Sequence, residues 1–185
     1  LVGDVGVGKS IFIRHLIKIG AKDILERSIV LYVDFGSEPA LEDDLHKYII
    51  EEFEGQLLES YNIDINERQF VRGVFHGDLR RFEKGIYSDL KESNTQLYRQ
   101  KEIEYIEQLL ANKEQHLKKS FTHLARGENR NVVVFLDNVD QRPPKFQEEV
   151  FLIAQTLADQ WPLTAFVSLR PETFIQSRDK GYIAA

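Results

Sequence analysis

The first ten residues hold glycines, a lysine and a serine at spacings that suit the binding of a phosphate group. Gly3, Gly6 and Gly8 carry no Cβ, so the backbone can approach an anion closely and turn its N–H groups toward it. Lys9 adds a mobile positive charge, and Ser10 adds a hydroxyl that can bind a magnesium ion. The alternative interpretation is a glycine-rich turn that precedes a helix with a surface lysine.

Residues 3–10 match the pattern Gly-x-x-x-x-Gly-Lys-Ser, the phosphate-binding loop of nucleoside triphosphatases. The apolar positions that follow predict a helix over about residues 9–19, ended by Gly20, with its positive dipole end toward the phosphates. A bound nucleotide would contact the loop and the start of this helix. The predicted nucleotide-binding residues are Gly3, Asp4, Val5, Gly6, Val7, Gly8, Lys9, Ser10 and Ile11.

Three mostly apolar stretches that end in polar residues predict the strands of a parallel sheet. They span residues 28–35, 131–136 and 163–169 and are rich in β-branched and aromatic residues. Ligand sites in such sheets lie at the carboxyl ends of the strands, where Asp34, Asp137 and Arg170 would stand. Each has a structural alternative, with Asp34 and Asp137 as turn formers and Arg170 as half of a surface ion pair.

The rest of the chain has helical periodicity. Helices are predicted near residues 40–58, 67–75 and 79–87, the last with Asp78 as its N-cap. Residues 88–127 predict a helical hairpin or one long helix with an apolar stripe from Ile103 to Leu124. Residues 40–127 would thus be a long helical insertion, either a partner-binding or oligomerising arm or a subdomain packed on the sheet. A later helix starts at Pro143-Pro144 and ends at Trp161, with an apolar face made by Phe146, Val150, Phe151, Ala154, Leu157 and Ala158.

Composition limits the class of protein. A chain of 185 residues suits one domain, here taken as residues 1–185, and the absence of cysteine excludes disulfides and thiolate metal sites. No apolar run is long enough to cross a bilayer, so we expect a cytoplasmic protein with no membrane partner. A net charge of −6 neither favours nor excludes nucleic acid. Only Leu1 and Val2 precede the loop, and we therefore expect a fragment that lacks the first and last strands of its sheet.

The loop, the strand that ends in Asp137 and the strand that ends in Ser168-Leu169-Arg170 occur in that order. This arrangement resembles the additional-strand P-loop NTPases, which include AAA+ proteins and STAND signalling ATPases. The resemblance implies a three-layer α/β fold in which residues 28–35 form the outer strand. The Walker-B strand, residues 131–136, would come next, followed by residues 163–169 and then by Leu1-Val2.

Two details resemble STAND ATPases more than ordinary AAA+ proteins. Asp137 is followed by Asn138 rather than by the usual AAA+ glutamate, and the next acid, Asp140, stands where NACHT-type proteins carry the acid that acts on water. The Ser-Leu-Arg ending is similar to the strand-terminal arginine motif of STAND proteins. The resemblance thus implies that Lys9, Asp137, Asp140 and Arg170 are catalytic, with Ser10 and Asp137 on Mg²⁺ and Arg170 as a γ-phosphate sensor. The alternative for Asp140 is a helix-capping acid.

The function that this resemblance implies is Mg-ATP binding and slow, regulatory hydrolysis by a switch ATPase of a larger protein. Such domains serve in bacterial defence or regulation, self-associate, and act on effector domains of the same full-length chain. Two alternatives stay open: an AAA+ or origin-recognition-like DNA-associated ATPase, and a P-loop kinase. The resemblance also implies ATP rather than GTP as the nucleotide. The sequence contains no Asn-Lys-x-Asp motif, which would specify guanine.

Overall fold

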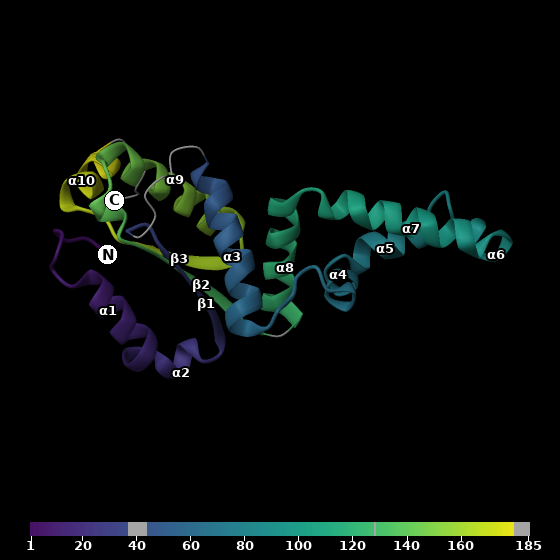
Figure 1. Cartoon of the computed structure of the whole chain (residues 1–185), viewed down its shortest axis with the longest axis horizontal. Coiled ribbons are helices and arrows are strands. Elements are labelled where there is room, and N and C mark those ends of the chain that lie inside the picture. Colours follow the sequence, from purple (N-terminus) through teal and green to yellow (C-terminus); the bar gives the residue numbers. More distant parts are fainter. Residues whose placement is uncertain (37–43, 128, 180–185) are drawn as a thin grey trace.

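The computed structural model describes residues 1–36, 44–127 and 129–179, which form an α/β body and a projecting helical arm (Figure 1). The body contains three parallel strands, β1 (Ser28–Asp34), β2 (Asn131–Asp137) and β3 (Leu163–Val167), in the order β1-β2-β3. Beyond β3, Val2 makes a parallel bridge to Leu169. The predicted α/β class with a parallel sheet is therefore confirmed, and the strand order matches the order that the resemblance implied.

One face of the sheet carries the main hydrophobic core. Alternate residues of β1 and β2 point to this face, because successive side chains of a strand point to opposite sides. Helices α3 (Leu45–Tyr61), α8 (Lys113–Gly127) and α9 (Pro144–Gln160) cover it (Figure 1). The strand residues buried there are Ile29, Leu31, Val33, Val132, Val134 and Leu136.

The helix after the loop lies on the other side of the sheet (Figure 1). It comprises α1 (Lys9–His15) and a wider π-helical turn, η1 (Leu16–Gly20), and a short α2 (Lys22–Leu25) follows. The predicted helix over residues 9–19 is thus present, with its last turn in the π form. Only Ile13 of α1 is buried, while Phe135 and Phe166 stack with ring centroids 5.0 Å apart on this face.

Between β1 and β2 the described residues form α3, α4 (Arg68–Val74), α5 (His76–Glu83), α6 (Leu90–Ser93), α7 (Thr95–Leu110) and α8. Asp44 caps α3 by accepting a hydrogen bond from Lys47 N at 2.9 Å. The predicted start at Ala40 lies outside the described residues. The prediction of Asp78 as an N-cap is wrong: α5 begins at His76, directly after α4, with Phe75 as N-cap and Asp78 in its first turn.

The prediction for residues 88–127 is also wrong in arrangement. Helices α7 and α8 diverge, so that α8 packs on the sheet while α7 belongs to the arm, which we define as residues 67–110 (Figure 1). The apolar stripe is divided accordingly: Leu117, Phe121 and Leu124 of α8 are buried, whereas Ile103 of α7 is 56% exposed. On α9, Ala158 was predicted to lie on the buried face but is exposed, and Gln147, which was not predicted there, is buried.

Two short elements complete the body near the carboxyl ends of the strands. A 3-10 turn, η2 (Val139–Gln141), follows β2, and α10 (Pro171–Asp179) follows β3. In the part of the chain that the structure describes, no helix has both the length and the apolar character needed to cross a membrane.

Candidate functional site

The glycine-rich loop has the backbone that its sequence predicts. Gly6 and Gly8 have φ angles of +85° and +90°, values that residues with a Cβ rarely adopt. A Cβ on Gly3 would stand 2.9 Å from Cγ2 of Val7, so this position also favours glycine. The loop leads directly into α1, where Phe12 N donates to Gly8 O at 2.9 Å.

Lys9 folds back into this loop. Its Nζ donates to Gly3 O at 2.6 Å and to Asp4 O at 2.8 Å, and it forms an ion pair with Asp140 Oδ2 at 3.0 Å. The side chains of Lys9 and Asp140 are only 9% and 5% exposed. The three protons of the ammonium group therefore all have acceptors, and a phosphate that entered the loop would compete with Asp140 for Lys9.

Asp137 ends β2 and is fully buried. Its Oδ1 accepts a hydrogen bond from Ser168 Oγ at 2.7 Å, and its Oδ2 accepts one from the Tyr32 hydroxyl. Burial alone would raise the pKa of Asp137, but hydrogen bonds from the hydroxyls of Tyr32, Ser10 and Ser168 and from the Asn138 backbone outweigh it and lower that pKa. Asp137 is therefore held as a carboxylate.

Asn138 connects the loop helix to β1. It adopts the left-handed conformation with φ +58°, donates from Nδ2 to Asp34 Oδ1 at 2.6 Å and accepts from Ser10 Oγ at 3.2 Å. Asp34 Oδ1 also accepts a hydrogen bond from Gly36 N at 2.8 Å. Asp34 therefore stabilises the turn after β1 and also contacts Asn138 at the site. The packing around Gly36 is tight, because a Cβ there would lie 3.1 Å from side-chain atoms of Asp34 and Asn138.

A magnesium ion fits the chemistry of Ser10 and Asp137. Both offer hard oxygen atoms, and Mg²⁺ in proteins commonly binds one or two carboxylates together with water and substrate phosphates. The low pKa of Asp137 keeps its charge available. The described residues contain no group of three or more His, Cys, Asp or Glu that could hold a metal ion.

Arg170 is half-buried behind Asp140. Its Nε donates to Asp140 O, and it makes no ion pair with a carboxylate among the described residues, contrary to the surface ion-pair alternative. Asp140 pairs with Lys9 and does not cap α9, whose N-cap is Pro143 with no side-chain cap.

Gln147, which is fully buried on α9, links the segments that follow β2 and β3. Its Nε2 donates to Arg142 O at 2.7 Å. Its Oε1 accepts from Arg170 N at 3.4 Å and from Thr173 Oγ1 at 2.9 Å. The segment that carries Asp140 and the segment that carries Arg170 are thereby held together through one side chain.

The structure brings the predicted residues Lys9, Ser10, Asp137, Asp140 and Arg170 to the same end of the sheet. The remaining loop residues would contact a nucleotide through their backbone atoms. Val5, Val7 and Ile11 are 53%, 63% and 74% exposed, so their side chains do not pack into the site.

Sequence reasoning missed Tyr32 and Gln147. The available signals were a tyrosine two residues before Asp34 in an alternating strand, and a polar residue on the apolar face of α9.

No protein-family model matches this chain, and neither the curated proteins nor the solved structures contain a significant match. Only the residues and geometry of the site therefore point to a function.

Proposed function

We propose that this chain binds Mg-ATP and hydrolyses it slowly to ADP and phosphate, as a nucleotide-controlled switch. The observation that carries the proposal is the position of Lys9. A buried, fully hydrogen-bonded lysine lies inside a glycine-rich loop, bonded to two loop carbonyls and 3.0 Å from the carboxylate of Asp140, at the carboxyl end of a parallel sheet. The P-loop and STAND-like assignments remain part of this proposal.

Binding would exchange one anion for another at Lys9. The β- and γ-phosphates would enter the loop, accept hydrogen bonds from its backbone N–H groups and take Lys9 from Asp140. Asp140 would then be a free carboxylate close to the γ-phosphate. Ser10 and Asp137 would hold magnesium, which when bound neutralises phosphate charge and orients the phosphates.

In the hydrolytic step, water attacks the γ-phosphorus while the bond to the β–γ bridging oxygen breaks. Asp140 would orient this water and accept its proton, and the products are ADP and inorganic phosphate. Lys9 and the loop amides would stabilise the charge that gathers on the phosphate oxygens. Asn138 cannot accept a proton, which leaves Asp140 as the acid for this role.

The switch would begin at Arg170. This side chain contacts Asp140 O, and Gln147 links its backbone to Thr173 of α10. A γ-phosphate that displaces Asp140 and attracts Arg170 would therefore shift the start of α10. Self-association, effector domains in the same full-length chain, and a cytoplasmic location belong to the same proposal.

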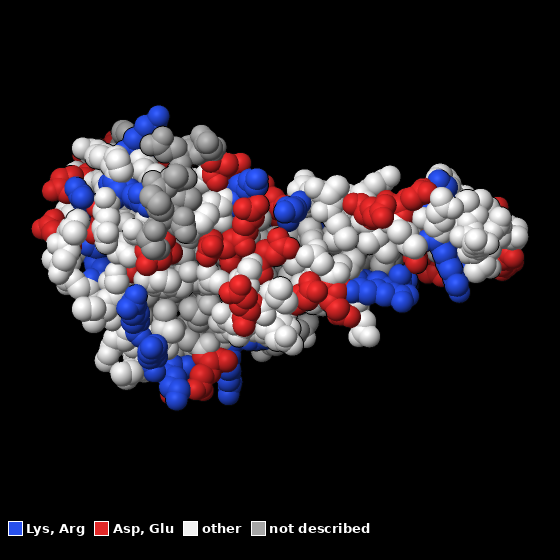
Figure 2. All heavy atoms as spheres, in the orientation of Figure 1, with Lys and Arg blue, Asp and Glu red and all other residues white. Residues whose placement is uncertain are grey.

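No observation favours the DNA-associated alternative. On the face seen in Figure 2, lysine and arginine side chains are interspersed with acidic ones rather than lining a channel. A kinase would also need groups that bind the molecule receiving the phosphate. Among the described residues, Asp140 is already bonded to Lys9 and Arg170, and no further group near it suggests such a binding site.

The experiment is nucleotide binding by Lys9→Ala, measured by calorimetry with ATP and magnesium. We expect the affinity for ATP to fall by roughly a hundredfold or more, because a charge-assisted contact to the phosphates is lost. Lys18→Ala, which removes an exposed lysine further along the same helical run, is the matched control and should bind normally. Unchanged affinity in Lys9→Ala would overturn the proposal, and competition by GTP would test the choice of nucleotide.

A further inference from the structure

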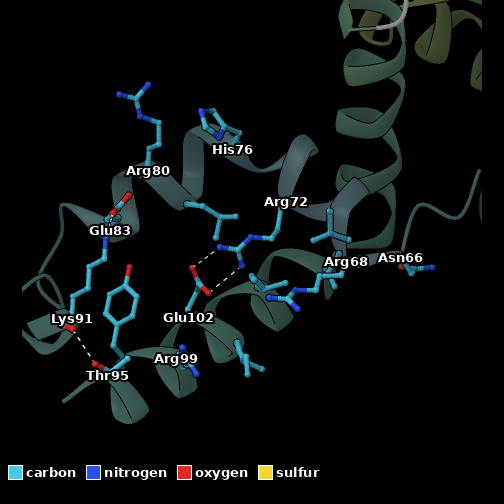
Figure 3. Close-up of a pocket in the computed structure, with 16 residues that line it drawn as sticks. Asn66, Arg68, Arg72, His76, Arg80, Glu83, Lys91, Thr95, Arg99 and Glu102 are labelled. Atoms are coloured by element: carbon cyan, nitrogen blue, oxygen red, sulfur yellow. Dashed lines mark hydrogen bonds and ion pairs between the residues drawn. The ribbon is translucent and has the colours of Figure 1, made fainter.

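Helix α7, the longest helix of the arm, leaves most of its side chains at least partly exposed. It has 16 residues, of which only Tyr98 is buried, whereas α8 has 15 residues and buries five. Its apolar side chains Ile103, Ile106 and Leu110 line an open groove of about 1050 Å³ between α7 and the α4–α5 segment (Figure 3). A helix with an uncovered apolar face is a common binding surface for another element.

The groove is elongated and runs between the faces of α7 and of the α4–α5 segment. The residues that α7 contributes recur at spacings of three and four over about four turns, and the α4–α5 segment faces them with the same periodicity. Helix α7 is about 24 Å long, and its lining residues extend along all of it, so the groove can accept a helix of similar length. The α7 lining residues are Thr95, Tyr98, Arg99, Glu102, Ile103, Ile106 and Leu110.

The groove is positively charged, although the whole chain has a net charge of −6. It is lined by five lysines and arginines and by two glutamates, which leaves three positive charges in excess. Glu102 is bidentate to Arg72 at 3.1 Å and Glu83 pairs with Lys91, as Figure 3 shows for the first pair. The unpaired cations among the described residues of the groove are Arg68, Arg80 and Arg99.

We propose that this groove binds an acidic amphipathic helix of a partner protein. Its apolar side chains would lie on Val71, Leu79, Ile103 and Ile106, and its carboxylates would reach the cations on either side. Arg68 and Arg80 stand on the α4–α5 side and Arg99 on the α7 side, so acidic residues are favoured on both flanks of the bound helix.

A helix suits this surface better than nucleic acid does. The floor is apolar and offers phosphates no partner, and two carboxylates, Glu83 and Glu102, lie within the groove. Two of the five cations are already neutralised by them. Binding of nucleic acid depends instead on many uncompensated cations along the backbone.

The test uses a library of 18-residue peptides that share one leucine stripe at helical spacing and carry glutamate, glutamine or lysine at the flanking positions. Binding to the whole 185-residue chain is followed by fluorescence anisotropy. We expect affinity to rise with the number of glutamates, to weaken with added salt, and to be at least about tenfold lower for lysine-flanked peptides. Failure of every peptide to bind, or binding that is independent of peptide charge, would overturn the proposal.

Two substitutions on the groove locate the binding surface. Ile103→Lys and Arg99→Glu change exposed side chains, so the fold should survive, and each should lower peptide affinity about tenfold. Ile86→Lys and Arg126→Glu are the matched controls, because both side chains are exposed and neither lines the groove. Equal loss in the controls, or no loss in the groove variants, would reject this surface.

The other occupants give distinct results that would replace the proposal. A 20-base-pair duplex DNA or an RNA strand that binds the chain and is lost in Arg99→Glu would assign the groove to nucleic acid. A dimer in sedimentation velocity that dissociates in Ile103→Lys would assign it to a second copy of the chain.

Discussion

At the scale of single residues, Lys9 and Asp140 form the pair on which the proposed chemistry depends most. Both side chains are nearly shielded from water, and removing one partner of a buried ion pair commonly costs about 3–5 kcal/mol. Lys9 would keep two carbonyl acceptors, Gly3 O and Asp4 O, if Asp140 lost its charge. Asp140 is therefore the position at which charge can be removed with least damage to the loop.

We predict that Asp140→Asn binds ATP at least as tightly as the unchanged chain and hydrolyses it about a hundredfold more slowly. Binding should not suffer, because the phosphate no longer competes with a carboxylate for Lys9. The rate should fall because an amide cannot accept the proton of the attacking water. Phosphate release at saturating ATP measures the rate, and calorimetry measures the affinity.

The matched control is Asp23→Asn, since Asp23 is an exposed acid of α2 and is not among the predicted site residues. It should hydrolyse ATP normally. A normal rate in Asp140→Asn would remove Asp140 from the mechanism and leave only its structural role beside Lys9.

Residue spacing was enough to predict a glycine-rich turn before a helix and the polar residues at the ends of the strands. The partners of these residues were not predictable. Tyr32 reaches Asp137 only because β1 and β2 pair in parallel with Asp34 opposite Asp137, and that register is a tertiary property. Gln147 was overlooked because periodicity assigns a face to each residue of a helix but does not say which buried positions need a polar group.

At the scale of elements, α7 and α8 show that hydrophobic periodicity predicts an apolar helix face but not the element that packs on it. Both helices have an apolar face, but a sheet covers one of these faces and an open groove borders the other. Sequence pattern gives the direction of an apolar face, whereas the element that covers it depends on the path of the chain. The short linker at Ala111-Asn112 redirects the chain and divides the predicted stripe.

The joint between the arm and the body contains a buried histidine. His116 of α8 stacks on Phe75 with ring centroids 5.5 Å apart, and its Nε2 has no hydrogen-bond partner among the described residues. Burial lowers the pKa of His116, against smaller opposing effects from Glu54 and the Ile65 backbone. The folded chain therefore holds this ring neutral under conditions in which the unfolded chain would protonate it.

We predict that the chain loses stability as the pH falls below about 6.5, and that His116→Phe removes part of this loss. The unfolded histidine gains a proton near pH 6.5 while the folded one does not, so the stability from a neutral His116 is full above that pH and declines below it. One such group contributes at most about 1.4 kcal/mol per pH unit. Urea unfolding at pH 7.5, 6.5 and 5.5 gives the slope.

His15→Gln, at an exposed histidine of α1, is the control and should keep the pH dependence of the unchanged chain. An unchanged slope in His116→Phe would show that the loss of stability at low pH arises at other groups.

At the scale of the whole molecule, the arm and the candidate site are separate. Every predicted site residue lies in the body, and the arm contacts the body at α8, where α4 and α7 pack and Asp78 of α5 pairs with Lys119 (Figure 1). The order of the strands was implied only by the resemblance to additional-strand P-loop NTPases, and the observed order β1-β2-β3 agrees with it. The projection of the arm could not be predicted, because the sequence pattern does not show which element will cover the apolar face of α7.

This separation predicts that replacing residues 67–112 with a short glycine-serine linker keeps nucleotide binding. His116 hydrogen-bonds the backbone of Ile65, so the ends to be joined, Asn66 and Lys113, lie near each other and a few flexible residues can connect them. The replacement removes Phe75 from the surface of α8, and we expect the melting temperature to drop by about 5 °C. ATP affinity by calorimetry should change less than about twofold, whereas binding of the acidic peptides should disappear.

The two readouts distinguish the proposed nucleotide binding from the proposed peptide binding. Lys9→Ala in the shortened chain should abolish ATP binding, which would show that the retained affinity comes from the loop, while Ile103→Lys in the full chain should leave ATP binding intact. A loss of ATP affinity of more than tenfold in a shortened chain that still shows a cooperative melting transition would mean that the arm shapes the nucleotide site from a distance. In that case a partner held in the groove and a nucleotide held in the loop would influence each other's affinity by the same factor, because such coupling is reciprocal.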